Sequence, residues 1–157
     1  MVAGIKEDMF YPTANSTRAQ IVSFLWRAEG RPEPTSAECK FTDVNGSKWY
    51  YKAVLWATEE GYVAGYTDTT FAPNATCKRA EMATFLWRMA GKPVPEGSEN
   101  PFFDVPAGKW YETAAQWAYE SGIVSGYELE EGTAFAPDNQ IARGETVTML
   151  YRYFKDK

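Results

Sequence analysis

One motif occurs three times in this chain of 157 residues and limits the folds that the chain can adopt. Each copy has a phenylalanine, a proline two residues later, and then an arginine and a second arginine at constant spacing. The copies span Phe10–Arg27, Phe71–Arg88 and Phe135–Arg152. Phe71 follows Phe10 by 61 residues, and Phe135 follows Phe71 by 64. A recurring period of this length is typical of a repeat protein, in which each copy forms one structural unit.

A second group of residues keeps the same period and completes the repeat. Its members are aspartate, two tryptophans and two glycines: Asp43, Trp49, Trp56, Gly61 and Gly65 recur as Asp104, Trp110, Trp117, Gly122 and Gly126. The longer second spacing comes from three extra residues within 128–132, where we expect an insertion in an exposed turn. When the period of 61 residues is counted backward, Val2 and Gly4 correspond to positions in the middle of a repeat, so the first copy lacks its front half. We therefore expect half of repeat 1 at 1–34, repeat 2 at 35–97 and repeat 3 at 98–157, all in one compact domain.

Composition excludes several classes of function. The net charge of −5 and the pI of about 4.9 argue against a nucleic-acid partner, which would need a clustered basic surface. We expect no membrane insertion, because no apolar run approaches the 18 or so residues that a spanning helix needs. The first residues lack the apolar stretch of a signal peptide, so a signal for export would lie outside this sequence.

The cysteines and the lack of histidine limit the metal chemistry. With no histidine and only Cys39 and Cys77, the chain has too few ligands for a zinc site, and we expect no metal and no cofactor. The two cysteines are either separate buried thiols or one disulfide bond, which would stabilise the fold by roughly 3 to 4 kcal/mol.

Apolar residues at helical spacing predict an all-α fold with long and short helices. In the first long helix, Ile21 and Leu25 lie on one face, Thr17 and Gln20 fit a capping box, and Gly30 ends the helix. Three long helices should pack together, flanked by two shorter ones. The expected helices are Thr17–Glu29, Trp49–Glu60, Lys78–Met89, Trp110–Glu120 and Arg143–Phe154.

The arginines that recur at the starts of the long helices are the first candidates for ligand binding. Arg18, Arg79 and Arg143 stand where the helix dipole disfavours a cation, so each needs a compensating partner. That partner is a ligand carboxylate held by the guanidinium and the free helix N–H groups, or an internal pair with Asp43 or Asp104. On the first interpretation, replacing Arg79 lowers affinity with little effect on the melting temperature; on the second, it lowers stability.

The repeated aromatic, acidic and glycine positions have both structural and binding interpretations. Trp49 and Trp110 could stack on a sugar ring or belong to the core, whereas Trp56 and Trp117, seven residues later, favour the core. Asp43 and Asp104 suit a helix cap or an Asx turn. Gly65 and Gly126 either allow a ligand to approach the backbone or adopt a positive φ in a turn.

Two segments resemble S-layer homology repeats: FTDVNGSKWYYKAVLWATEEGYVAGYTDTTFAPNATCKRAE, residues 41–81, and FFDVPAGKWYETAAQWAYESGIVSGYELEEGTAFAPDNQIARGE, residues 102–145. The shared features are Phe-x-Asp-Val, a Trp-Tyr pair, Gly-x-x-x-Gly, Phe-x-Pro and an Arg-Ala-Glu type motif. The resemblance implies a pseudo-threefold domain with a central three-helix bundle and short helix and loop prongs. It also implies that grooves between prongs bind secondary cell-wall polysaccharide, often carrying a pyruvate ketal. Such modules tether secreted proteins to Gram-positive envelopes.

Two other classes of function have less support. A glycosidase would need two carboxylates at one bond, but the repeated acids, Asp43 with Asp104 and Glu81 with Glu145, should occupy separate equivalent sites, so we expect no enzyme. A protein-interaction or self-assembly module is the alternative. The incomplete first repeat should leave apolar surface uncovered, so we also expect a homodimer or a domain swap.

Overall fold

The computed structural model describes residues 12–97 and 99–157, so the repeat positions Val2, Gly4 and Phe10 lie outside the described residues. The described part contains five helices and one two-stranded antiparallel hairpin, which confirms the prediction of a mostly helical fold. The helices are α1 (Arg18–Ala28), α2 (Tyr51–Glu59), α3 (Arg79–Met89), α4 (Glu112–Glu120) and α5 (Arg143–Phe154). The strands are β1 (Tyr127–Leu129) and β2 (Gly132–Ala134).

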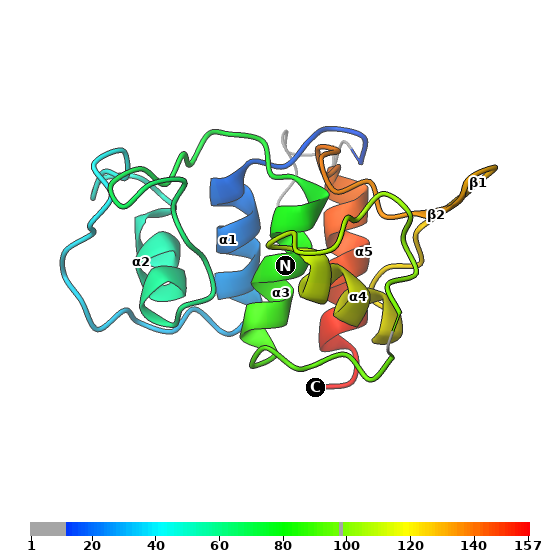
Figure 1. Cartoon of the computed structure of the whole chain (residues 1–157). Helices are drawn as coiled ribbons and strands as arrows, with labels where there is room; N and C mark the ends of the chain where they lie inside the picture. The colour runs from blue at the N-terminus through cyan, green and yellow to red at the C-terminus, as the bar shows by residue number, and fades with distance from the viewer. Residues whose placement is uncertain (1–11, 98) are drawn as a thin grey trace.

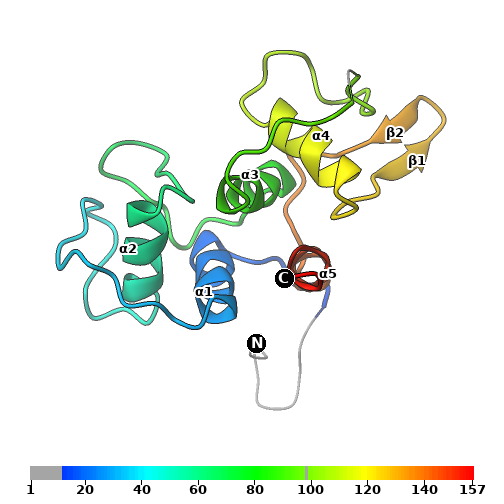
Figure 2. The ribbon, with the colours of Figure 1, turned by 90° about the horizontal axis from the view of Figure 1, so that it is seen from below.

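The three longer helices, α1, α3 and α5, form the centre of the molecule. They run side by side in Figure 1 and stand at the corners of a triangle when seen from below in Figure 2. Helix α2 packs against the outer side of α1, and α4 packs against α3. Each short helix therefore belongs to one repeat and covers the long helix of the repeat before it.

The core confirms the predicted helix faces. Phe24, Phe85 and Met149 occupy similar places on the three long helices, and each is 3% exposed. Trp56 and Trp117 are also in the core, at 5% and 9% exposure, as their spacing predicts. Burying each side chain of this size contributes roughly 1.5 to 3 kcal/mol. The apolar stripes of the long helices thus hold the bundle together.

A ring of backbone hydrogen bonds closes the pseudo-threefold arrangement just before the long helices begin. The N–H of Ser16 donates to the carbonyl of Ile141 (2.9 Å), that of Ile141 to Cys77 (2.8 Å), and that of Cys77 back to Ser16 (2.8 Å). Because each bond joins a different pair of repeats, the three copies hold one another in register.

The same neighbours satisfy the first N–H groups of the long helices. These groups donate across the repeats at 2.8 to 3.1 Å in a cyclic order: Arg18 to Ala75, Ala19 to Pro73, Arg79 to Asn139, Ala80 to Pro137, Arg143 to Ala14 and Gly144 to Pro12. A helix N-terminus usually leaves such donors free for an anion. The expectation of free N–H groups beside the arginines is therefore wrong for these six donors.

Local details refine the other predictions. Thr17 and Gln20 form the predicted capping box on α1, and Gly61 has the positive φ of a helix-ending residue (74°). The extra residues of repeat 3 extend an exposed turn into the β1–β2 hairpin, which projects away from the bundle (Figure 1). Cys39 and Cys77 are free thiols, so the disulfide alternative is wrong.

Candidate functional site

Two grooves occupy equivalent places between neighbouring repeats. The Arg18 groove has a volume of about 400 Å³, and the Arg79 groove about 590 Å³. Eight pairs of lining residues correspond through the repeat: Arg18 with Arg79, Ala64 with Ser125, Gly65 with Gly126, Tyr66 with Tyr127, Glu81 with Glu145, Thr84 with Thr148, Phe85 with Met149, and Arg88 with Arg152. Lys78, Trp110, Tyr111 and Asp138 line the Arg18 groove alone.

Arg18 lies at the bottom of its groove with its hydrogen-bonding groups engaged by repeat 2. Its side chain is 2% exposed and forms an ion pair from Nη1 to Glu81 Oε2 at 2.7 Å. Nε donates to the carbonyl of Phe71 (3.0 Å) and Nη2 to that of Ala64 (2.7 Å). The guanidinium therefore fastens the start of α1 to the turn and the long helix of the next repeat.

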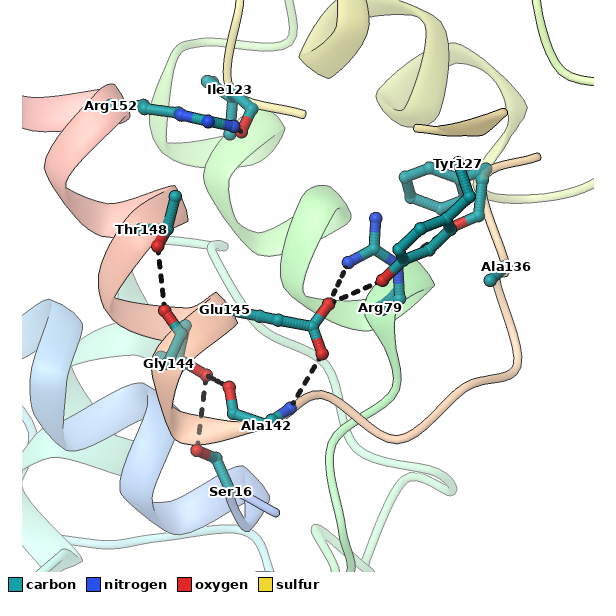
Figure 3. Close-up of polar contacts among 12 residues, drawn as sticks. Ser16, Arg79, Ile123, Tyr127, Ala136, Ala142, Gly144, Glu145, Thr148 and Arg152 are labelled. Carbon is teal, nitrogen blue, oxygen red and sulfur yellow. Dashed lines mark hydrogen bonds and ion pairs between the residues drawn. The ribbon is translucent and has the colours of Figure 1, made fainter. Parts of the chain in front are cut away.

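Arg79 makes the corresponding contacts with repeat 3 (Figure 3). Its Nη1 lies 2.5 Å from Glu145 Oε2, and its Nε donates to the carbonyl of Phe135 at 2.8 Å. Figure 3 also shows the hydroxyl of Tyr127 pointing at the same carboxylate, to which it donates at 2.9 Å. One glutamate thus accepts from a cation of the preceding repeat and from a tyrosine of its own repeat.

The tyrosine completes the same cluster in the Arg18 groove. Tyr66 donates to Glu81 Oε1 at 2.8 Å, and the Arg18 guanidinium lies 4.3 Å from the centre of the Tyr66 ring. Desolvation, followed by the hydrogen bond to Glu81, raises the pKa of Tyr66 to about 12. The phenol therefore stays protonated at neutral pH and keeps its donor on the glutamate.

These contacts correct the partners predicted from the sequence. The arginines pair internally, but with Glu81 and Glu145 and not with Asp43 or Asp104. Both oxygens of Asp43 accept backbone N–H groups, from Phe71 (2.9 Å) and Ala72 (2.7 Å).

Asp104 makes the same pair of bonds to Phe135 and Ala136, each at 2.8 Å. Ala72 and Ala136 have positive φ values of 60° and 58°, which L-residues adopt at a cost. The aspartates therefore hold a strained turn in place.

The outer tryptophans lie outside the core. Trp49 and Trp110 are 59% and 60% exposed and precede α2 and α4 by two residues. They do not share the buried helix face of Trp56 and Trp117, so the alternative that Trp49 and Trp110 belong to the core is wrong. Trp110 lines the Arg18 groove, whereas Trp49 lines a separate pocket of about 610 Å³ between α2 and the 33–37 linker.

The glycines at the groove floor are explained by close packing. A Cβ atom on Gly65 would lie 2.5 Å from Phe41 Cε1 and from the carbonyl oxygens of Thr67 and Thr70. Gly126 has a φ of 75°, and its Cβ would lie 2.7 Å from Thr133 Cγ2. The predicted positive φ therefore holds for Gly126 and does not explain Gly65.

Arg143 occupies the third equivalent position. It is 2% exposed, and its guanidinium lies 5.6 Å from the ring of Phe24, as that of Arg18 lies from the ring of Phe85. Burial lowers the pKa of Arg143. The glutamate position is Gln20 here, and its amide oxygen accepts from the N–H of Thr17 at 2.8 Å. Gly4, the repeat counterpart of Gly65 and Gly126, lies outside the described residues.

Sequence reasoning missed the second arginine of each groove. Arg88 and Arg152 lie in the last turns of α3 and α5, nine residues after Arg79 and Arg143 respectively. The sequence did contain a signal for these arginines, because each is the last residue of a copy of the repeated motif. The internal partners Glu81 and Glu145 were also repeated, but their distance from the arginine of another repeat could not be read from the spacing.

Comparison with known proteins decides the family. The sequence profile described as the S-layer homology domain matches residues 40–83 and 101–147, which together make up more than half of the chain. The chain belongs to the S-layer homology domain family. The two matched segments are the second and third repeats, and the half-copy at the N-terminus supplies the long helix α1 of the S-layer homology bundle.

Three similar proteins are named for the cell surface. The chain is 31% identical over 160 residues to cell surface glycoprotein 1 of Acetivibrio thermocellus, covering 95% of this chain and 7% of that protein. It is 28% identical to the cellulosome-anchoring protein of Acetivibrio thermocellus, covering 95% and 34%. It is 26% identical to the surface-layer 125 kDa protein of Lysinibacillus sphaericus, covering 97% and 13%. The S-layer homology chain therefore spans about a third or less of each relative.

Family membership supports a coarse statement of function. The S-layer homology domain is a non-catalytic anchoring module, although similar proteins include enzymes that carry it. The chain belongs to the cell-surface proteins associated with an S-layer or cell wall. Within residues 12–97 and 99–157, no helix has the length and apolar character needed to cross a membrane.

Proposed function

We propose that the chain tethers its parent protein to the cell envelope by binding secondary cell-wall polysaccharide, often pyruvylated, in the grooves between repeats. The observation that carries this proposal is the pair of repeat-related grooves, each with a polar floor and a cationic edge. Sugar-binding sites combine such groups with an aromatic side chain that covers the apolar face of a ring. Trp110, 60% exposed beside the Arg18 groove, supplies that side chain.

The residues predicted as ligand-binding then divide into two roles. Trp49 and Trp110 offer exposed surface for stacking. Arg18 and Arg79 form the base of the two grooves, where their ion pairs shape the floor under a ligand, and Arg143 holds the equivalent buried position. Gly65 and Gly126 have no side chain, so a ligand can lie close to the backbone at the floor of each groove. Asp43 and Asp104 hold the turns that form the rim of the grooves. We also propose that the repeats divide at 1–34, 35–97 and 98–157 within one domain, and that this domain binds without catalysing a reaction.

Sedimentation with purified sacculi tests the proposed function. The chain should sediment with sacculi that carry the wall polysaccharide and stay in solution with sacculi stripped of it. Trp110→Ala should weaken this binding, whereas Tyr119→Ala, which removes a 41% exposed aromatic that does not line the Arg18 groove, should not. Equal binding to both kinds of sacculi would contradict a polysaccharide ligand.

Self-association is the alternative function, and one feature of α5 favours it. Helices α1 and α3 are each covered by a short helix, whereas Tyr151 on α5 is 67% exposed. A second chain, by pairing or domain swapping, could cover that side of α5. Light scattering at increasing concentration should then show a dimer that Tyr151→Asp disrupts; a monomer at all concentrations would remove this alternative.

A further inference from the structure

The end of the β1–β2 hairpin, residues 128–131, presents one apolar side chain among acidic ones. Leu129 is 53% exposed, and its three acidic neighbours are exposed as well: Glu128, Glu130 and Glu131. Repeat 2 has a shorter turn at this place, because the three extra residues belong to repeat 3. Removing an apolar side chain of this size from water is favourable. The hairpin tip is therefore an apolar knob with an acidic surround, suited to a partner that covers it.

The glutamates limit which partner can cover the hairpin tip. Two tips from different copies would bring like charges together, which disfavours edge-to-edge pairing of strands. Glu128 also fixes the shape of the hairpin, because its carboxylate accepts a hydrogen bond from the Thr133 hydroxyl at 2.9 Å. A fitting site for the tip combines an apolar hollow with cations at its mouth.

The pocket of about 610 Å³ between α2 and the 33–37 linker, the α2–linker pocket, has this combination. Three large apolar or aromatic side chains and two lysines are among its lining residues: Trp26, Tyr51, Leu55, Lys48 and Lys52. The acidic lining residue Glu33 contacts Lys52 at 2.9 Å, in a pair whose side chains are 73% and 56% exposed. A pair this exposed contributes little, so an incoming glutamate can share Lys52.

Hydrogen bonds hold the wall of the α2–linker pocket in place. The Tyr51 hydroxyl donates to the carbonyl of Ala37 at 3.1 Å. The N–H of Thr35 donates to the Glu59 carboxylate at 2.9 Å. Both bonds fasten the 33–37 linker to α2. A site that is already formed loses little conformational freedom when it is filled, which favours binding.

The corresponding place in repeat 3 lacks the apolar and cationic character of this pocket. Three lining positions change from repeat 2 to repeat 3: Tyr51 to Glu112, Lys52 to Thr113 and Leu55 to Gln116. The Gln116 amide also donates to the carbonyl of Gly97 at 2.7 Å, so a polar contact stands where repeat 2 has a leucine. Repeat 3 thus carries the acidic tip, and repeat 2 carries the pocket that complements it.

The hairpin tip and the α2–linker pocket lie at opposite ends of the molecule. Figure 2 shows α2 on one side of the three long helices and the β1–β2 hairpin on the other, and Figure 1 shows the same separation. A chain therefore cannot place its own tip in its own pocket. A contact between two different surfaces of identical chains leaves one surface of each kind free, so it can continue from copy to copy.

We infer that the hairpin tip of one copy docks in the α2–linker pocket of the next copy, with Leu129 against Leu55 and the tip glutamates beside the two pocket lysines. This head-to-tail contact differs from the pairing on α5 considered above. It involves neither groove between the repeats and does not rest on polysaccharide binding. The contact is small and partly ionic, so it forms when chains are concentrated, as on a surface, and it weakens as salt is added.

Sedimentation velocity at increasing protein concentration and low salt tests the contact. The average mass of the wild-type chain should rise beyond that of a dimer without reaching a plateau, and added salt should lower it. Leu129→Ser should weaken association by about tenfold or more, the size expected when a leucine side chain is no longer buried. Val94→Ser, which removes an 86% exposed apolar residue outside both surfaces, should associate like the wild type.

Mixing two variants tests whether the contact joins two different surfaces. The tip variant is Leu129→Ser, and the pocket variant combines Lys48→Glu with Lys52→Glu, two exposed positions at which the fold should tolerate the change. Each variant alone should stay monomeric at concentrations where the wild type associates. A mixture should form a dimer that grows no further, because the intact tip of one variant fills the intact pocket of the other.

Three results would overturn the inference. The first is a wild-type chain that stays monomeric, or that stops at a dimer which Tyr151→Asp disrupts. The second is association of Leu129→Ser at the wild-type level. The third is a mixture of the tip and pocket variants that gives no dimer. Sedimentation with sacculi tests the polysaccharide proposal separately, so either idea can fail without the other.

Discussion

Arg18→Met should destabilise the fold strongly, because it breaks a buried ion pair between repeats. The substitution removes the 2.7 Å pair with Glu81 and the hydrogen bonds to the carbonyls of Phe71 and Ala64. Glu81 is 6% exposed and would keep only its hydrogen bonds from uncharged groups, such as that of Tyr66. Removing one partner of a buried pair costs roughly 3 to 5 kcal/mol. A loss of about 4 kcal/mol lowers the melting temperature of a domain of this size by about 8 to 16 °C.

Thermal and urea unfolding followed by tryptophan fluorescence measure this loss. The matched control is Lys52→Met, which removes an ion pair with Glu33 whose side chains are 56% and 73% exposed. A surface pair of this kind contributes about 1 kcal/mol or less. Adding Glu81→Gln to Arg18→Met should recover part of the loss, because no buried charge is then left unpaired. If Arg18→Met costs no more than Lys52→Met, the arginine does not hold the repeats together.

Three further predictions concern single residues. Gly65→Ala should destabilise the domain because its Cβ would meet Phe41 and two carbonyl oxygens at 2.5 Å, whereas Gly46→Ala, with 3.9 Å to its nearest atom, should be tolerated in the same urea titration. Stability should fall as the pH rises from 10 toward 12, because folding raises the pKa of Tyr66 and Tyr153 from 10.0 to about 12, and Tyr66→Phe should reduce that fall. Stability should also fall as the pH drops below 4.5, because hydrogen bonds led by that from the Thr35 N–H lower the pKa of Glu59, and Glu59→Gln should weaken this dependence. An unchanged alkaline profile in Tyr66→Phe, or an unchanged acid profile in Glu59→Gln, would contradict the corresponding assignment.

The helices and the core could be predicted from the sequence because both depend on local spacing. The predicted long helices Lys78–Met89 and Arg143–Phe154 match α3 and α5 to within one residue, because apolar residues at intervals of three and four define one buried face. The short helices begin later than predicted, at Tyr51 and Glu112, because the tryptophans before them stand in a turn. Their repeated spacing made these tryptophans look like part of the helix.

The partners of the arginines could not be predicted in the same way, because they depend on how the repeats meet. Arg18 and Glu81 are 63 residues apart, and the sequence-based prediction named Asp43 or Asp104 as the internal partner instead. The packing places the start of α1 beside the start of α3, which brings Glu81 to the Arg18 guanidinium. Asp43 instead accepts a hydrogen bond from the backbone of the turn at Phe71. The sequence-based expectation that Arg79→Ala leaves stability almost unchanged is therefore replaced by an expected loss similar to that of Arg18→Met.

The most direct measurement of groove binding is an NMR titration of the ¹⁵N-labelled chain with purified secondary cell-wall polysaccharide. The account predicts that the indole N–H signal of Trp110 and the amide signals of Gly65 and Tyr66 shift together as polysaccharide is added. The indoles of Trp26 and Trp87 should stay in place, because they donate to the carbonyls of Pro32 and Pro93 away from the Arg18 groove. Saturable shifts that leave Trp110, Gly65 and Tyr66 unchanged, or no shifts at all, would contradict binding in that groove.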